Sequence, residues 1–470
     1  MCGIAGIYSS TVQTSEKEFQ LALHTLKKRG PNAEGIYAFA KGFLGHTRLS
    51  IIDTSDAANR PMRNETEDYV IVFNGEIFNF QELKKTKLHS FSIPFKTNSD
   101  TEVLLHLLIH FGTECLNWLS GFFTFAFLQK STNTLLLARD RYGKKPLFIY
   151  QREEELFFAS EMKALLALPM SREINLDALA MYFQLNYLPT DKCMLQDVRK
   201  VKPGHFVQIK NQQIEEGCYY KIHIQSDKYA IHKYEDAQKH IEKLLANSVQ
   251  ERMISDVPLG AFLSGGIDSS VIVALAARYT DKLKTFTIGY KDNKLFDETY
   301  YANLVAQKYN TDHHVFYLSE TEFKEEVFHV LDYLDEPFAD SSCIPQYILS
   351  KYTKQHVTVA LSGDGGDEVF AGYNKHGAEW MMRHNAPLSI LAKLSAPILR
   401  KLPASKNTKI GNITRQLVKL GHGAQLSNAE RYIRWCSILD EEEVCQLLSR
   451  SVQQQLHVEK LKQDNLKYAN

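Results

Sequence analysis

From about residue 234 to residue 361 the sequence alternates between helical and strand patterns, and this alternation restricts the fold more than any other feature. Apolar runs predict strands at 259–263, 283–288, 314–318 and 356–361, with segments of helical apolar spacing between them. Consecutive strands joined by helices are expected to run parallel, which predicts an α/β domain with a doubly wound parallel sheet. Ligands of such sheets bind at the carboxyl ends of the strands, so we expect a binding site there.

The part of the chain before about residue 165 follows a different pattern, in which short apolar or aromatic runs are bounded by turn residues. These runs predict strands at 1–8, 69–73, 122–128, 134–138 and 156–159. An early helix is expected because Ser15 and Glu18 form a capping box and Gly30-Pro31 supplies a stop signal. We therefore expect an α+β domain with much antiparallel pairing. With its connecting segment this domain covers residues 2–212, and the α/β domain covers residues 213–470.

Composition excludes several classes of protein. The 470 residues include 55 Lys and Arg against 55 Asp and Glu, so the formal net charge is zero and neither nucleic acid nor an anionic membrane is an expected partner. The chain has no apolar stretch of about 18 residues and no secretory layout at its start, which favours a cytoplasmic protein with small-molecule partners. The 7 cysteines include no C-x-x-C pair, so we expect neither a disulfide framework nor a zinc site.

Cys2 is the first candidate catalytic residue. If Met1 is removed, Cys2 carries both a thiol and a free α-amine, whose pKa is about 7.7–8.0. The amine can then accept the thiol proton, directly or through a water, which is the N-terminal form of nucleophilic catalysis. A cysteine after the initiator methionine is by itself more often an ordinary strand residue, so the neighbouring motifs have to decide.

Three segments support a catalytic Cys2: residues 45–53 (GHTRLSIID), 73–79 (FNGEIFN) and 97–102 (TNSDTE). Together with residues 1–6, 138–147 and 158–161, they resemble the class II glutamine amidotransferase family, which has the N-terminal nucleophile hydrolase fold. The resemblance implies that Cys2 is the nucleophile. The Asn74 side chain and the Gly75 N–H would form the oxyanion hole, and Asn74 would also contact glutamine. An isolated Asn-Gly pair between apolar runs more often indicates a hairpin turn.

The resemblance also implies residues that hold the two charged ends of glutamine. Arg48 would bind the α-carboxylate, and Glu76 and Asp100 would receive the α-ammonium group. Taken singly, each of these three residues is more often a solvated surface charge, but their order behind Cys2 favours the binding site. Two positions depart from the family pattern, Asn32 where Asp is usual and Arg60 where Gln is common, and we expect neither to have a catalytic role.

The second constellation is residues 263–270 (LSGGIDSS), which follow a predicted strand and open a predicted helix. Backbone N–H groups and the positive end of the helix converge there, so the segment is expected to bind an anion. It lacks the lysine of a Walker loop and instead resembles the pyrophosphate loop of ATP-pyrophosphatases. The resemblance implies an ATP site formed by Leu263, Ser264, Gly265, Gly266, Asp268, Ser269, Ile288, Ser362 and Gly363.

A second loop, residues 361–373 (LSGDGGDEVFAGY), follows the last predicted strand and is expected at the same edge of the sheet. Two acidic loops beside a pyrophosphate require a cation. Proteins typically bind Mg²⁺ through one or two carboxylates together with phosphate oxygens. We therefore expect Asp268 and Asp367 to hold Mg²⁺. Asp364 is the expected acid-base group, because one branch of the family has Glu at its position.

The order of the two constellations, with residues 335–342 (DEPFADSS), resembles the glutamine-hydrolysing asparagine synthetase family. The resemblance implies that Mg-ATP adenylates the aspartate side chain and that ammonia from glutamine then displaces AMP, with a homodimer as the assembly. Family members continue into a closing segment that we do not find after Gly377, so we expect a C-terminally incomplete synthetase domain. Two alternatives stay open: a related amidotransferase acting on another carboxylate such as a sugar acid, and a glutaminase-only or ATP-binding remnant.

Overall fold

The structure is a computed structural model. It describes residues 1–467 except 153, 190, 212, 223–230, 232, 293–296, 386, 388–389, 395–408 and 457. The chain forms two compact units: the first comprises Met1–Glu173, Pro189–Glu336 and Ser341–Ser362, and the second comprises Ile174–Leu188, Pro337–Asp340 and Gly363–Asn470. The domain boundary at residues 212 and 213 stays a prediction.

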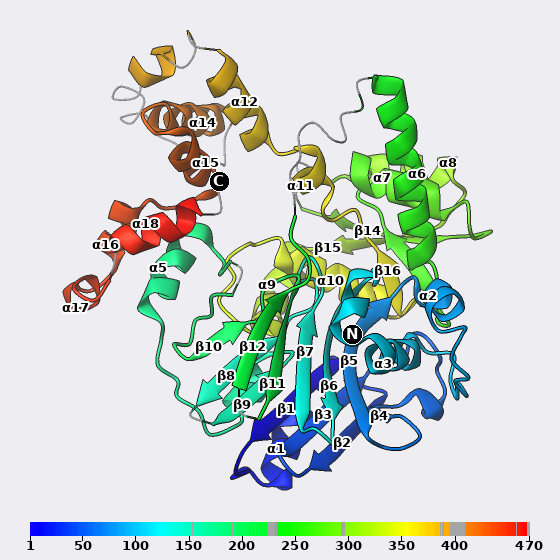
Figure 1. The fold of residues 1–470 in the computed structure, drawn as a ribbon. Coiled ribbons are helices and arrows are strands. Elements are labelled where there is room, and N and C mark those ends of the chain that lie inside the picture. The colour runs from blue at the N-terminus through cyan, green and yellow to red at the C-terminus, as the bar shows by residue number, and fades with distance from the viewer. Residues whose placement is uncertain are drawn as a thin grey trace. The chain divides into compact units, whose positions relative to one another are not determined.

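The first unit contains two antiparallel sheets of six strands each, coloured from blue to green in Figure 1, which confirms the predicted α+β character. The first sheet has the order β10 (Val198–Lys200), β8 (Phe148–Arg152), β9 (Glu155–Ala159), β1 (Gly3–Ser9), β3 (Gly42–Arg48) and β2 (Ala33–Phe39). The second has the order β12 (Gln213–Cys218), β11 (His205–Lys210), β7 (Thr134–Arg139), β6 (Gly121–Gln129), β5 (Tyr69–Ile77) and β4 (Met62–Arg63).

Alternation along β5 explains how the two sheets stack. Val70 and Val72 point into an apolar core that also contains Ile4 of β1, so this core lies between the sheets. Ile71 and Phe73 point to the opposite face, which helices α2 and α3 cover. Helices α1 and α4 cover the outer face of the first sheet, which gives four layers in the order helix, sheet, sheet, helix. These helices span Glu16–His24 (α1), Phe80–Lys87 (α2), Asp100–Phe111 (α3) and Met162–Leu166 (α4), and short 3₁₀ helices span Asp56–Ala58 and Gly112–Asn117.

The predicted parallel sheet is confirmed in the same unit, with the strand order β15 (Asp312–Leu318), β14 (Lys284–Tyr290), β13 (Leu259–Phe262) and β16 (Val359–Leu361). Val273 and Ala302 pack with Ala261 of β13 on one face, and Leu349 packs against Phe286 on the other, so the sheet is doubly wound. The helices are α6 (Tyr234–Arg252), α7 (Ile267–Ala276), α8 (Thr299–Lys308), α9 (Glu320–Tyr333) and α10 (Cys343–Thr353).

The second unit is helical in its described residues. Met181 and Leu185 of α5 pack with Val444 and Leu461 in its core, beside a buried hydrogen bond of 2.8 Å from the Asn465 amide to the Gln184 side-chain oxygen. Its helices are α5 (Leu176–Leu185), α11 (Gly366–Phe370), α12 (Asn374–His384), α14 (Lys409–Gly423), α15 (Asn428–Cys436), α16 (Glu441–Leu447), α17 (Arg450–Gln453) and α18 (Val458–Leu466).

The structure also bears on cysteines and on membrane spans. All seven cysteines are free thiols. Across the described ranges, none of the helices combines the length and the apolar character that crossing a membrane would require.

A buried carboxylate ties α12 to α15 in the second unit. Glu379 accepts hydrogen bonds from Arg431 Nε and Nη2, each at 2.8 Å, from Trp435 Nε1 at 2.8 Å and from Arg383 Nε at 2.7 Å. Although burial opposes ionisation, the hydrogen bonds from Arg431, Arg383 and Trp435 lower the pKa of Glu379 to about 2. The folded pKa lies below the ordinary value of 4.5, so this stabilisation is present above about pH 4.5 and is lost as the pH falls toward 2.

We expect Glu379→Gln to lower the free energy of unfolding of this unit by about 3 kcal/mol at pH 7, because Arg431 is left buried without its counter-ion. The variant is also expected to lose the decline in stability of the natural protein between pH 4.5 and pH 2. Hydrogen exchange of the α15 amides measures both effects. Glu442→Gln, at an exposed position of α16, is the matched control and should leave the protection unchanged.

Candidate functional site

Strand pairing places Cys2 beside the segment that carries Arg48. Gly3 pairs with Thr47 across β1 and β3, so Cys2 lies next to the end of β3. The Leu49 N–H donates to Cys2 Sγ at 3.4 Å, and the side chain of Cys2 is almost fully buried. The guanidinium of Arg29 donates to the Cys2 carbonyl at 2.8 Å, which fixes the backbone at this position.

Asn74 and Gly75 lie inside β5, where they pair with Thr124 and Phe123 of β6. The hairpin turn considered for this Asn-Gly pair is therefore wrong. A Cβ atom at residue 75 would lie 2.2 Å from the carbonyl oxygen of Phe122, so only glycine fits this close approach. The Asn74 side chain is fully buried, with Nδ2 at 3.5 Å from Ser160 Oγ and with Oδ1 unpartnered among the described residues.

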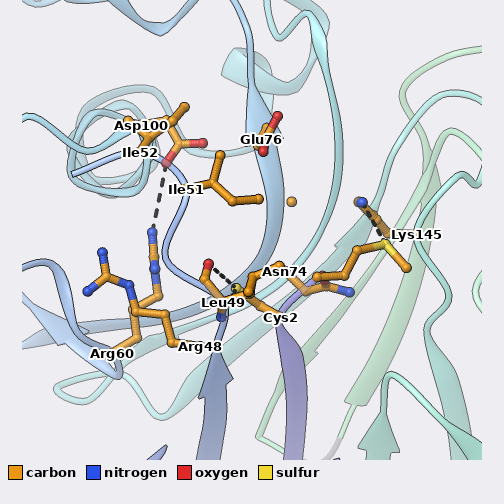
Figure 2. A pocket seen from close by; sticks show the side chains of 12 residues that line it. Cys2, Arg48, Leu49, Ile51, Ile52, Arg60, Asn74, Glu76, Asp100 and Lys145 are labelled. Atoms are coloured by element: carbon orange, nitrogen blue, oxygen red, sulfur yellow. Dashed lines mark hydrogen bonds and ion pairs between the residues drawn. The ribbon is translucent and has the colours of Figure 1, made fainter. Parts of the chain in front are cut away.

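These residues open into one pocket of the first unit, shown from close by in Figure 2. The structure brings together six predicted site residues there: Cys2, Arg48, Asn74, Gly75, Glu76 and Asp100. Arg48 and Asp100 are 1% and 2% exposed, so their alternative interpretation as solvated surface charges is wrong. The lining is completed by residues to which the sequence motifs gave no role, namely Met1, Leu49, Ile51, Ile52, Arg60 and Lys145.

Backbone carbonyl groups orient Arg48. Its Nη1 donates to the carbonyl oxygen of Ser55 at 2.8 Å and to Asn59 Oδ1 at 2.7 Å, and its Nη2 donates to the carbonyl oxygen of Asp53. Arg48 Nε is buried without a hydrogen-bond partner in the described chain. The guanidinium is thus held in the pocket without a carboxylate partner of its own, which suits a group that binds the carboxylate of a ligand.

The lining of the pocket also includes two carboxylates, Glu76 and Asp100. Asp100 begins α3 and accepts a hydrogen bond of 3.0 Å from the Ile77 N–H. Burial raises the pKa of Asp100, while the nearby Arg60 guanidinium, 3.8 Å away, opposes this effect. Burial, followed by the negative charge of Asp100, raises the pKa of Glu76 to about 7. The two carboxylates therefore share a site that favours binding of a cation.

Lys145, labelled in Figure 2, and Met1 are in contact in the lining of the pocket. Lys145 Nζ lies 3.0 Å from Met1 Sδ, and burial lowers the pKa of the lysine while the charge of Glu76 opposes that effect. Burial also lowers the pKa of the Met1 α-amino group to about 5. The Met1 amine is therefore mostly neutral near pH 7.

Two residues of the pocket could have been found only in part from the sequence. Arg60 is visible as a departure from the family pattern, but nothing in the sequence shows that its side chain reaches Asp100 and donates to Thr101 Oγ1. Asn32, the other departure, accepts a hydrogen bond of 3.0 Å from the Ser50 N–H and so supports the loop after β3. Lys145 lies within a quoted motif, yet only the fold places it beside Glu76.

The predicted nucleotide loop lies between β13 and α7, at the carboxyl edge of the parallel sheet. Gly265 has a φ of +83°, and a Cβ atom there would lie 2.5 Å from the Ala302 backbone nitrogen, so the loop requires glycine at this position. Ser264 Oγ accepts from the Gly266 N–H at 3.2 Å and lies 3.0 Å from Ser269 Oγ. These hydrogen bonds stabilise a turn that leads directly into α7. The free N–H groups at the start of a helix are the groups that bind an anion.

The other predicted ATP residues follow neighbouring strands. Leu263 is buried and donates its N–H to the Phe286 carbonyl at 2.9 Å, and Ile288 lies on β14. Because Ala261 of β13 pairs in parallel with Leu361 of β16, Ser362 leaves the sheet at the same edge as the nucleotide loop. Gly363, Asp364 and Asp367 belong to the second unit, where Asp367 lies in α11.

Asp268 offers a carboxylate of the kind that binds Mg²⁺. The Asp268 carboxylate lies in the first turn of α7 and makes no hydrogen bond or ion pair with the described residues. In the part of the chain that the structure covers, no three His, Cys, Asp or Glu side chains form a group placed to hold a metal ion. Mg²⁺ needs no such group, since one or two carboxylates and substrate phosphates usually bind it.

Family models match both parts of the chain. The model described as a glutamine amidotransferase domain matches residues 1–220, which contain the whole Cys2 pocket. The model described as asparagine synthase matches residues 240–469, which contain the parallel sheet and its two acidic loops.

Several named proteins are similar over most of the chain. "Putative asparagine synthetase (glutamine-hydrolyzing) 2" of Methanocaldococcus jannaschii is 34% identical over 460 residues, which covers 92% of this chain and 86% of that protein. "Asparagine synthetase (glutamine-hydrolyzing) 1" of Bacillus subtilis is 36% identical over 80% of this chain and 59% of that protein. Similarity to the solved B. subtilis glutamine phosphoribosylpyrophosphate amidotransferase is weak, with a TM-score of 0.37 and 19% identity over 67% of this chain and 65% of that chain, and adds nothing to the assignment.

We expect Arg60→Leu to lower the Tm of the amidotransferase part by roughly 5–10 °C, because Asp100 then remains buried without its counter-ion. Differential scanning calorimetry measures the shift. The double variant R60L/D100L removes both charges and should lose less than R60L alone. Arg63→Leu, in β4, breaks an exposed ion pair with Glu67, four positions further along the chain, and is the matched control. Equal losses in R60L and R63L would contradict the importance of the buried pair.

Proposed function

Because the chain belongs to the glutamine-hydrolysing asparagine synthetase family, we propose that it makes asparagine from aspartate, ATP and glutamine at two sites. The observation that carries the proposal is the convergence of Cys2, Arg48 and Asp100 in one pocket of a chain that also presents the LSGGIDSS loop between a parallel strand and a helix. The first site releases ammonia from glutamine. The second site activates aspartate with ATP.

At the first site, removal of Met1 would expose the α-amine of Cys2 in the buried environment described above. The amine accepts the thiol proton, and the thiolate attacks the side-chain amide carbon of glutamine. Asn74 Nδ2 and the Gly75 N–H stabilise the oxyanion of the tetrahedral intermediate. The carbon–nitrogen bond then breaks, ammonia leaves with the transferred proton, and water hydrolyses the Cys2 thioester to glutamate.

Recognition of glutamine follows the charges of the pocket. The Arg48 guanidinium binds the α-carboxylate in a bidentate manner, because its backbone contacts already orient it toward the pocket. The α-ammonium group binds between Glu76 and Asp100. This arrangement places the substrate's side-chain amide toward Cys2 and Asn74, at the remaining side of the pocket.

At the second site, the β-carboxylate of aspartate attacks the α-phosphorus of ATP, which breaks the bond to the bridging oxygen and releases pyrophosphate. The N–H groups of the nucleotide loop bind the phosphates. Asp268 and Asp367 would hold Mg²⁺, which supplies positive charge against the phosphate oxygens when bound. Ammonia attacks the aspartyl carbonyl carbon, AMP leaves, and Asp364 is the proposed acid-base group for this transfer.

The family also supports three statements about context. We propose small molecules as the only partners outside the assembly, a homodimer as the assembly and the cytoplasm as the location. Aspartate is the proposed acceptor, whereas a sugar acid or another carboxylate would define a related amidotransferase.

We expect Cys2→Ala to lose glutamine-dependent asparagine formation by at least about 1,000-fold, because no other group supplies the nucleophile. The same variant should keep ammonium-dependent formation of asparagine, AMP and pyrophosphate. Asp268→Asn should instead lose product with both nitrogen donors, since it acts at the second site. Product-resolved mass spectrometry with Mg-ATP, aspartate and either glutamine or ammonium measures all three products.

Matched controls for this experiment are Cys218→Ala, an exposed cysteine, and Asp281→Asn, an exposed aspartate after α7. Both should behave as the natural protein. Glutaminase activity without any asparagine from ammonium would contradict the proposed acceptor. Pyrophosphate release with sugar acids would then indicate a related amidotransferase, and its absence with every acceptor would indicate a glutaminase-only protein.

The pKa of Glu76 predicts how glutamine binding depends on pH. Because only the ionised carboxylate attracts the α-ammonium group, the apparent KM for glutamine is expected to fall about tenfold between about pH 6 and pH 8. Glu76→Gln should raise KM and flatten this dependence. Steady-state glutaminase kinetics across this range separate the effect on KM from the effect of the Cys2 amine on kcat. A variant that keeps the original pH dependence of KM would assign it to another group.

A further inference from the structure

Asp256 makes two hydrogen bonds from the nucleotide-binding part of the first unit to the glutamine pocket. It lies between α6 and β13, and its N–H donates to the carbonyl oxygen of Ile51 at 3.0 Å. Its carboxylate accepts from the Asp53 N–H at 2.7 Å. Ile51 lines the pocket, so these bonds attach directly to the loop that follows Arg48.

Asp53 is the residue through which this contact reaches Arg48. The carbonyl oxygen of Asp53 accepts from Arg48 Nη2, and its carboxylate accepts from the Ser55 N–H at 3.1 Å and the Asn98 N–H at 2.8 Å. Asp53 has a φ of +52°, a left-handed conformation that is uncommon for residues other than glycine. Hydrogen bonds to the carbonyl oxygen, the carboxylate and the N–H of Asp53 stabilise this conformation. The acceptor for the N–H is the Asp256 carboxylate.

The orientation of Arg48 therefore depends on the Asp53 turn. Two of the three acceptors of the Arg48 guanidinium are the carbonyl groups of Asp53 and Ser55. If the turn relaxes, both carbonyl groups move, and the guanidinium loses the support that directs it into the pocket. A group bound by Arg48 would be affected first, whereas Asn74 is held inside β5 by its pairing with β6, and Cys2 adjoins Gly3, which is held by its pairing with β3.

Other residues near Asp256 also contact the part of the chain that forms the glutamine pocket. The Arg252 guanidinium lies 4.5 Å from the ring centre of Phe78, and the Ser120 hydroxyl donates to Glu251 at 3.2 Å. Ile254 packs against the core on the helical side of the second sheet. Asp256 itself forms hydrogen bonds to the backbone of the loop that carries the Arg48 acceptors, at Ile51 and Asp53.

We propose that Asp256, supplied by the nucleotide-binding part of the chain, is a positioning residue for glutamine, acting through Asp53 on the Arg48 site for the α-carboxylate. The assignment rests on the proposed function of the Cys2 pocket. It implies that glutamine affinity depends on a residue close to the start of β13, the strand that leads into the nucleotide loop.

The test is glutaminase kinetics of the full chain with Asp256→Ala. KM for glutamine is expected to rise about tenfold with kcat little changed, because one hydrogen bond that supports binding is removed. The discriminating substrate is 4-aminobutanamide, which keeps the amide and the amine but lacks the α-carboxylate. Its kcat/KM should be the same in D256A and in the natural protein, whereas general damage to the pocket would lower both substrates alike.

Three further variants complete the design. Asp256→Asn keeps an acceptor oxygen for the Asp53 N–H and should restore most of the affinity for glutamine. Asp292→Ala is the matched control, because Asp292 likewise accepts a backbone N–H, that of Glu320 at 3.0 Å, elsewhere in the nucleotide-binding part. Should D256A not fold, Asp256→Ser takes its place, since its side chain is too short to reach Asp53.

An unchanged KM for glutamine in D256A, or equal losses with both substrates, would overturn the positioning role. In either case the natural protein would still hydrolyse glutamine, so the proposed function would stand. A natural protein without glutaminase activity after removal of Met1 would overturn the proposed function and the positioning role together.

Discussion

The pairing of β1 with β3 is the interaction on which the glutamine pocket depends. It sets Cys2, which precedes β1, beside Arg48, which ends β3, although the two residues are far apart in the sequence. A shift of the register by one residue would turn every side chain of β1 to the opposite face and remove Cys2 from the pocket. The four-layer core fixes the register, because Ile4 and Ala5 must enter different apolar clusters.

That core allows the pocket to hold an unusual concentration of charge. Arg48, Arg60 and Asp100 are all less than one tenth exposed, and Glu76 and Lys145 lie beside them. Burial of a single charge is costly, but opposite charges at short distance compensate each other. Arg48 has no carboxylate partner of its own, and the pKa of Glu76 is raised. A zwitterionic ligand would supply a carboxylate to Arg48 and an ammonium group to Glu76 and Asp100. The same contacts that bind such a ligand would therefore also orient it.

Much of the fold could be predicted from the sequence, because its signals are local. The capping box of Ser15 and Glu18 and the alternation of helices and strands after Tyr234 both depend on near neighbours, and both are confirmed. Contacts between distant segments were not predictable in this way. Ser160 meets Asn74 because the two sheets stack, and Arg60 meets Asp100 because α3 packs on the second sheet beside Phe73, and no spacing along the chain encodes these approaches. The hairpin alternative for Asn74-Gly75 fails for the same reason, since pairing with β6 overrides the local preference for a turn.

Asp53 illustrates why such long-range contacts matter for function. Its N–H, its carbonyl oxygen and both oxygens of its carboxylate are all engaged, with Asp256, Arg48, Ser55 and Asn98 as partners. Any movement of Asp53 would break several hydrogen bonds at once, so these bonds stabilise its left-handed conformation. The residue thereby joins the loop after β3 to the segment between α6 and β13. The ligand for Arg48 meets a guanidinium whose position is set partly by the chain that leads into the nucleotide loop. The Asp53 turn is thus a physical connection between the Arg48 site and the segment that leads into β13.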